Sequence, residues 1–190
     1  MAAAARDHGV VNRAFPLALL SLAVAVGPAH AATSVKRYVP WTPVGEPTTA
    51  RYFHGSGECL QASRVSSRAD AWRCVSGTIA LDPCFLSPTD DEVLCVRSPW
   101  ARRGHLLSAV IDPDTHGSSP APDAWALRVG RRRCTYIAGR PRRSGPTYRC
   151  GKRGFLFGRP NRRKATWTIR AARARQGRNT RRVRIRAAWT

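Results

Sequence analysis

No acidic residue follows Asp123 in this chain of 190 residues. From Arg128 to Thr190 there are 22 basic residues, whereas residues 32–127 hold 9 basic and 10 acidic ones. The positive excess therefore lies in the last third, and that composition excludes an evenly charged surface there. A block of one charge sign favours anionic partners. Arginine outnumbers lysine 30 to 3, and GC-rich codon usage is an alternative explanation for the choice of arginine.

Long apolar runs are absent after residue 31. The one uncharged apolar run, Phe15–Val26, follows Arg6 and Arg13 and precedes Ala29-His30-Ala31. This order is typical of a secretory signal peptide, and a dozen or so residues are too few for a permanent membrane helix, which needs roughly 20. We expect residues 1–31 to be a cleaved leader, with a retained N-terminal anchor as the alternative. The mature protein is then secreted or displayed at the cell surface, outside the cytoplasm.

The sequence has no C-x-x-C pair and no histidine at zinc-finger spacing from a cysteine pair, so we expect no metal site. All six cysteines follow the leader: Cys59, Cys74, Cys84, Cys95, Cys134 and Cys150. An even number in an exported chain predicts three disulfides and no free thiol nucleophile. Other connectivities stay open, but we favour pairing in sequence order, because the last two pairs each bracket a predicted hairpin.

Turn residues divide the chain after Trp72 into short strands. We predict strands over residues 77–81, 93–97, 105–111, 124–129, 134–137, 147–150, 154–157, 165–171 and 181–189, with Asp82-Pro83 among the breakers. Such spacing predicts a mainly β fold, a small disulfide-stabilised antiparallel sandwich or barrel. We expect residues 52–190 to form a single domain, with at most one short helix near Arg68–Ala71. Residues 32–51, which contain three prolines, are predicted to be a flexible arm.

The end of the chain alternates apolar and basic residues. Val183, Ile185, Ala187 and Trp189 alternate with Arg182, Arg184 and Arg186. Period-two alternation places the apolar set on the core and the arginines toward water. This pattern predicts an arginine-faced C-terminal hairpin whose loop covers residues 173–179.

The basic third supplies the candidate binding residues. They are Arg131, Arg132, Arg133, Arg142, Arg143, Arg162, Arg163, Arg182, Arg184 and Arg186. A large positive potential attracts polyanions and makes binding sensitive to salt. The expected partners are an anionic cell-envelope polymer, acidic lipid or extracellular nucleic acid, and the alternative is a solvated basic face. We expect a monomer without a cofactor.

Histidines are scarce: only His54, His105 and His116 follow the leader. A nucleophile elbow around Ser56 needs glycine two residues before and two residues after the serine, where this chain has His54 and Glu58. Residues 112–116 gather two carboxylates and an imidazole but lack the glycine and final glutamate of a calcium loop, so we expect a surface turn. We therefore predict a non-catalytic binding module. The alternatives are a small secreted hydrolase using one of the three histidines, or a domain that binds a protein through Trp41 or Trp100.

Several motifs carry a family resemblance. They are Gly57-x-Cys59, Ser63-x-x-Ser66-x-Arg68-x-Asp70-Ala71-Trp72-Arg73-Cys74, Asp82-Pro83-Cys84-Phe85, Val93-Leu94-Cys95, Ala124-Trp125-Ala126-Leu127, Tyr148-Arg149-Cys150 and Ala188-Trp189. This pattern resembles an uncharacterised secreted six-cysteine domain family of actinobacteria and related bacteria, over most of residues 57–189. The resemblance implies an extracytoplasmic compartment and a disulfide framework, and no assigned function. Leu60, where that family usually has Trp, and the arginine-rich third depart from its pattern.

Overall fold

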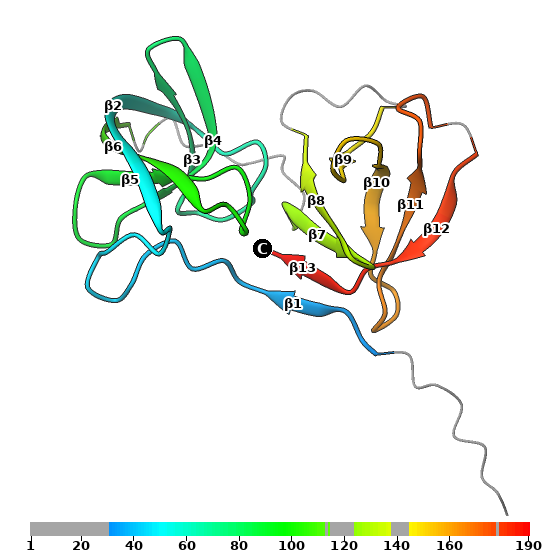
Figure 1. Cartoon of the computed structure of the whole chain (residues 1–190). Coiled ribbons are helices and arrows are strands. Elements are labelled where there is room, and N and C mark those ends of the chain that lie inside the picture. Colours follow the sequence, from blue (N-terminus) through cyan, green and yellow to red (C-terminus); the bar gives the residue numbers. More distant parts are fainter. Residues whose placement is uncertain (1–30, 113, 115–123, 138–144, 178) are drawn as a thin grey trace, which may run out of the picture.

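The computed structural model describes residues 31–112, 114, 124–137, 145–177 and 179–190. Residues 1–30 of the predicted leader lie outside this part. The described chain forms two β units that lie side by side (Figure 1), so the predicted mainly β, disulfide-stabilised fold is confirmed. Within these residues, no helix has the length and apolar character needed to cross a membrane.

The first unit is a closed five-stranded barrel. Its strands are β2 (Arg51–Ala62), β3 (Ala71–Ser76), β4 (Ile79–Leu86), β5 (Glu92–Cys95) and β6 (Arg103–Ile111). Consecutive strands pair antiparallel, and β2 closes the barrel by pairing parallel with β6. The prediction that Asp82-Pro83 ends a strand is wrong. Both residues lie inside β4, where the register with β3 shifts, and such a bulge accommodates a proline that has no N–H to donate.

The second unit is an eight-stranded sheet in the order β1-β13-β7-β8-β9-β10-β11-β12. Its strands are β1 (Ser34–Lys36), β7 (Ala126–Val129), β8 (Arg132–Tyr136), β9 (Tyr148–Arg149), β10 (Phe155–Asn161), β11 (Thr168–Ala172), β12 (Arg181–Arg184) and β13 (Ala187–Trp189). The expected hairpin of β11 and β12 is present. However, the single strand predicted over residues 181–189 is two strands, because the chain leaves β11 after Arg184 and pairs with β1 and β7 from Ala187 onward.

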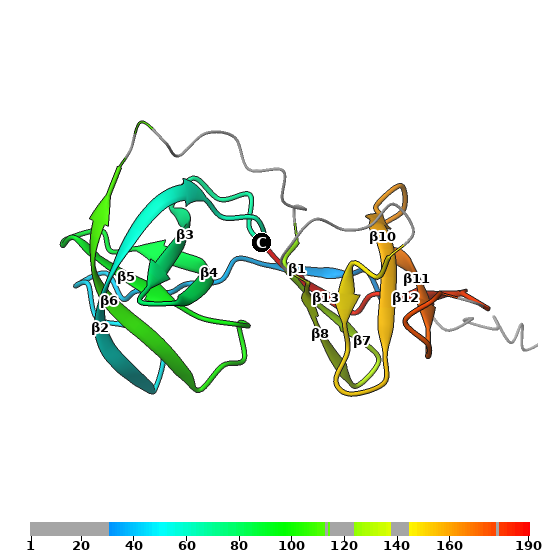
Figure 2. The same cartoon turned by 90° about the horizontal axis from the view of Figure 1, so that it is seen from above.

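This change of partner curls the sheet. β12 lies at one end of the strand order and β13 near the other, yet only two residues separate them in the chain. Thr33 joins the two ends: its hydroxyl donates to the carbonyl of Ile185 (2.7 Å) and accepts from the amide of Trp167 (2.8 Å). The eight strands therefore surround an interior of their own (Figure 2).

The three disulfides pair the cysteines in sequence order, as predicted. Cys59–Cys74 joins β2 to β3, Cys84–Cys95 joins β4 to β5, and Cys134–Cys150 joins β8 to the residue that follows β9. The first two bonds connect residues that are directly opposite each other in the barrel. Each bond therefore fixes strands that are already neighbours in a sheet.

An apolar cluster joins the two units. Phe85 of the barrel packs against Trp125 (ring centroids 5.9 Å apart), and Tyr38 contacts both rings at 5.3 and 5.6 Å. Beside them, Trp100 of the barrel meets Trp189 of β13 edge to face at 4.8 Å. Where the sequence predicts one β domain over residues 52–190, the structure thus has two sheets, each with an apolar cluster of its own, joined by a third cluster to which both contribute.

The prediction of a flexible arm over residues 32–51 is wrong for much of that segment. β1 pairs parallel with β13, and Trp41 is buried with its indole N–H donating to the carbonyl of Phe85 (3.1 Å). The segment therefore crosses from the curled sheet to the barrel (Figure 1). The pairing of β1 has no local sign in the sequence, because its partner strand lies far away along the chain.

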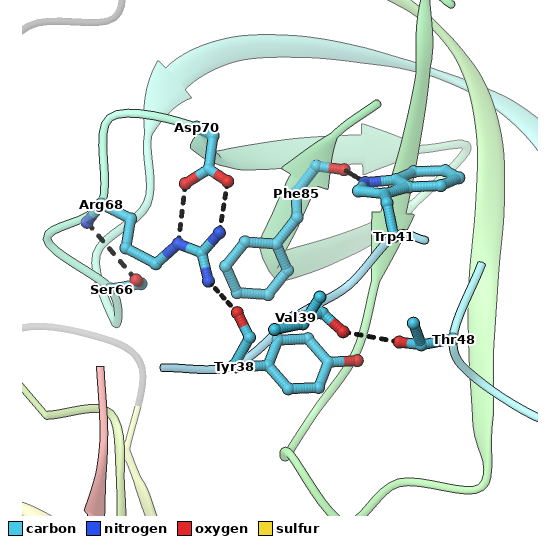
Figure 3. A network of polar contacts seen from close by, with 8 residues as sticks. All are labelled: Tyr38, Val39, Trp41, Thr48, Ser66, Arg68, Asp70 and Phe85. Carbon is cyan, nitrogen blue, oxygen red and sulfur yellow. Dashed lines mark hydrogen bonds and ion pairs between the residues drawn. The ribbon is translucent and has the colours of Figure 1, made fainter. Parts of the chain in front are cut away.

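Arg68 holds the crossing segment against the barrel (Figure 3). Its guanidinium donates to both carboxylate oxygens of Asp70, with an Nε–Oδ1 distance of 2.7 Å, and to the backbone carbonyl of Tyr38. It also lies over the ring of Phe85, 4.7 Å from the centroid. The short helix predicted near these residues is absent from the structure. Asp70 lies in a turn and Ala71 begins β3. The polar side chains make local hydrogen bonds, and such bonds compete with the backbone hydrogen bonds of a helix.

The two units contain a similar hairpin. Asp70-Ala71-Trp72 and Asp123-Ala124-Trp125 are each followed, five residues after the tryptophan, by a glycine. Gly77 and Gly130 have φ values of +56° and +58° and form the turns β3–β4 and β7–β8. A positive φ strongly favours glycine, so the shared spacing has a structural reason. No repeat was expected from the sequence.

Candidate functional site

The candidate catalytic histidines are separated in the barrel. In the parallel pair of β2 and β6, His105 is opposite Phe53, whose ring lies 5.6 Å from the imidazole, and His54 is the next residue along β2. Because successive side chains of a strand point to opposite faces, His54 and His105 lie on different sides of the sheet. In the described part of the chain, neither imidazole is hydrogen-bonded to a hydroxyl or a carboxylate. His116 lies outside the described residues.

Asp82 of β4 is a partly buried acid in the barrel. It accepts hydrogen bonds from the Ser63 hydroxyl (2.5 Å) and the Arg64 amide (3.0 Å). Burial raises the pKa of Asp82 above its ordinary value, although these bonds and the charges of Arg73 and Arg64 act in the opposite direction. Asp82 and His105 line one hollow of about 480 Å³. The carboxylate binds the backbone of its own barrel, which is a structural role.

Two other groups contain residue types that bind metals. The sulfurs of Cys74, Cys84 and Cys95 lie within 4.8 Å of one another, but all three belong to disulfides and offer no thiolate. In the acidic turn, the carboxylate of Asp112 accepts from the amide of Asp114 (3.1 Å). This contact is the local bond that a surface turn makes.

The predicted row of C-terminal arginines is exposed. Arg182 and Arg184 of β12 alternate with Val183, and Arg186 is exposed in the bend before β13. Ile169 and Val183 are opposite each other and face the interior, so the next pair, Arg170 and Arg182, faces outward. The sequence pattern thus predicted the exposure of these arginines, whereas the strand pairing that brings Arg170 opposite Arg182 was not predicted.

Strand alternation divides the run Arg131-Arg132-Arg133. Arg133 is opposite Arg128, and both are exposed on the outer face, because the neighbouring pair Leu127 and Cys134 is buried. The guanidinium of Arg133 lies 5.6 Å from the ring centroid of Trp100. Arg132 is opposite Val129 and shares the inner face with Cys134. Three consecutive arginines therefore do not form one patch.

The remaining candidates lie in loops. Arg162 and Arg163 are exposed in the turn between β10 and β11, where Arg162 lies 5.4 Å from the ring centroid of Trp167. Arg142 and Arg143 lie outside the described residues. The sequence did not single out Arg128, Arg170, Arg173 and Arg181 as binding residues. The first two are recognised only from the strand pairing, and the last two from a hollow in the curled sheet that both of them line.

The tryptophans considered for protein binding are engaged within the chain. Trp41 belongs to the core, and Trp100 packs against Trp189. The fold and the site together define a mainly β, three-disulfide protein with a strongly basic curled sheet. No protein-family model, curated protein or solved structure matches the chain. The resemblance to a secreted six-cysteine family therefore stays a prediction.

Proposed function

We propose that this protein is an exported, non-catalytic binding module that contacts an anionic polymer or an acidic membrane surface through the outer face of its curled sheet. Export is supported by the leader-like N-terminus and by three disulfides, which persist in oxidising compartments. A binding role is supported by the charge on the outer face, which we define as the exposed residues Arg128, Arg133, Arg170, Arg182 and Arg184.

The observation that carries this proposal is the pairing of like charges. Arg128 is opposite Arg133, and Arg170 is opposite Arg182, each pair in adjacent antiparallel strands. Like charges directly opposite each other destabilise a sheet. The sequence from residue 124 onward has no acidic side chain to offset them. An anionic ligand supplies the missing negative charge, and the release of its counterions favours binding.

The proposal is tested by titrating the oxidised protein with an anionic wall polymer and with vesicles that contain acidic lipid. Each titration is carried out at low and at high salt. The variant Arg170→Thr/Arg182→Thr removes two outer charges while keeping residues suited to strands. Its matched control, Arg97→Thr/Arg102→Thr, removes two exposed charges from the barrel. We expect the outer-face variant to weaken binding at least fivefold more than the control. Equal weakening by both variants, or binding that is independent of salt, contradicts the proposal.

A further inference from the structure

The curled sheet has a hollow at one end of its interior. Its volume is about 790 Å³, within the range of about 300–1,000 Å³ that is usual for small-molecule sites. Leu156, which is buried, and the partly buried Val129, Ala171 and Val183 line it, and all four belong to the apolar core of the sheet or pack against it. The floor of the hollow is therefore an apolar surface continuous with the core.

Arginines surround this apolar floor. Arg131, Arg132, Arg173 and Arg181 line the hollow and all four are exposed, and none of the described residues that line it is acidic. Arg132 is opposite Val129 and Arg181 is opposite Ala171, so alternation places both on the inner face of the sheet, on strands β8 and β12. In the part of the chain that the structure describes, the four guanidinium groups have no hydrogen-bond or ion-pair partner.

We propose that this hollow binds one amphiphile that has an apolar chain and a single anionic headgroup. The chain lies on Val129, Leu156 and Val183, and the carboxylate or phosphate lies between Arg132 and Arg181. The planar guanidinium group suits both headgroups, because it donates two parallel hydrogen bonds to them. The apolar floor gives a hydrophilic polymer nothing to bind, and a neutral lipid leaves the arginines without a counter-charge. This site faces inward and is independent of the outer-face arginines.

Calorimetric titration of the oxidised protein with four probes tests the ligand class, and the two anionic amphiphiles are kept below their micelle concentrations. The probes are dodecanoate, dodecyl phosphate, dodecanol and inorganic phosphate. We expect one saturable site for each anionic amphiphile, at least tenfold tighter than for the alcohol, and no saturable binding of inorganic phosphate. The ratio of the first two affinities distinguishes a fatty acid from a phospholipid source. The proposal is overturned if dodecanol or inorganic phosphate binds as tightly as the two anionic amphiphiles do.

Two consecutive residues provide a matched pair of variants. Arg181→Gln and Arg182→Gln remove the same charge from β12, but the two side chains point to opposite faces. We expect Arg181→Gln to weaken dodecanoate binding about tenfold and to leave the binding of the anionic polymer unchanged. Arg182→Gln should weaken the binding of the anionic polymer and leave dodecanoate binding unchanged. If Arg181→Gln unfolds the sheet, as judged by circular dichroism, Arg132→Gln takes its place. Ala171→Leu, which fills the hollow, should weaken all three chain-bearing probes. Equal weakening of dodecanoate binding by Arg181→Gln and Arg182→Gln overturns the proposal.

Discussion

Arg170 and Arg182 are directly opposite each other on β11 and β12, and both side chains are exposed on the outer face. One residue along each strand, Ile169 and Val183 form the pair that faces the interior. The apolar pair fixes the register of the two strands, since a slip by one residue would exchange the two faces. The arginines are consequently held together by the same pairing that buries their neighbours.

The first prediction concerns the stability cost of this arrangement. Replacing Arg182 by Thr should raise the free energy of unfolding by roughly 0.5 kcal/mol at low ionic strength, because it removes the repulsion across the strand pair. The gain should shrink at high ionic strength, where salt screens exposed charges. Urea unfolding at two salt concentrations measures both effects. A loss of stability at low salt would show that the two guanidinium groups do not repel each other.

The second prediction concerns Arg68, whose side chain is 12% exposed. Arg68→Lys should lower the free energy of unfolding by about 2 kcal/mol, because lysine cannot make the paired bonds to Asp70 and also reach the Tyr38 carbonyl. Arg64→Lys is the matched control, since Arg64 is exposed and its guanidinium donates to Gln61 at the surface. The control should change stability by less than about 0.5 kcal/mol. Similar effects of both changes would mean that Arg68 does not hold the crossing segment against the barrel.

The third prediction concerns the disulfides, beginning with Cys84–Cys95, one of the two buried disulfides of the barrel. Cys84→Ala/Cys95→Ala should lower the free energy of unfolding by about 3 kcal/mol, the loss expected when a loop of this size is opened. The corresponding pair Cys134→Ala/Cys150→Ala encloses a loop of similar length and should cost a similar amount. Chemical denaturation of the oxidised variants measures both losses. An unchanged midpoint for either variant contradicts the structural role of that bond.

The fourth prediction is a pH dependence that arises from Asp82. Burial raises its pKa above the ordinary value of 3.8, so the folded protein holds this proton more tightly than the unfolded chain does. Its contribution to stability is therefore fully present below pH 3.8 and is lost as the pH rises through the folded-state pKa. The side chain in Asp82→Asn cannot ionise. The free energy of unfolding of this variant should therefore increase relative to that of the native protein as the pH rises through the folded-state pKa of Asp82.

Thermal unfolding of the native protein and of Asp82→Asn across the acidic pH range measures this difference. Asp91→Asn, on an exposed loop of the same barrel, serves as the control and should follow the native protein. A constant difference between native protein and Asp82→Asn at every pH would show that Asp82 does not titrate in this range.

Strand content and disulfide pairing could be predicted from the sequence because both depend on local patterns. Alternation around Val183 and the spacing of Cys84 and Cys95 each describe neighbours that are close along the chain. The pairing of β1 with β13 could not be predicted in this way, since its partners are separated by about 150 residues. The arm prediction failed for that reason.

The candidate site shows a similar division. Exposure of Arg182 and Arg184 follows from alternation within one strand and was predicted. The pairs that make the outer face, and the inward position of Arg132, depend on which strands are adjacent and in which register. The hollow depends in addition on the curling of the sheet, which Thr33 stabilises through bonds to Ile185 and Trp167.

The salt dependence of polyanion binding tests the central claim most directly. Duplex DNA serves as a probe of known charge spacing, and the logarithm of its affinity should fall steeply and linearly with the logarithm of the salt concentration. The slope of this line should become shallower by about 2 in Arg170→Thr/Arg182→Thr, because each arginine that contacts a phosphate releases about one counterion. The barrel control Arg97→Thr/Arg102→Thr should keep the native slope. A slope near zero, or one that the outer-face variant leaves unchanged, would contradict binding through this face.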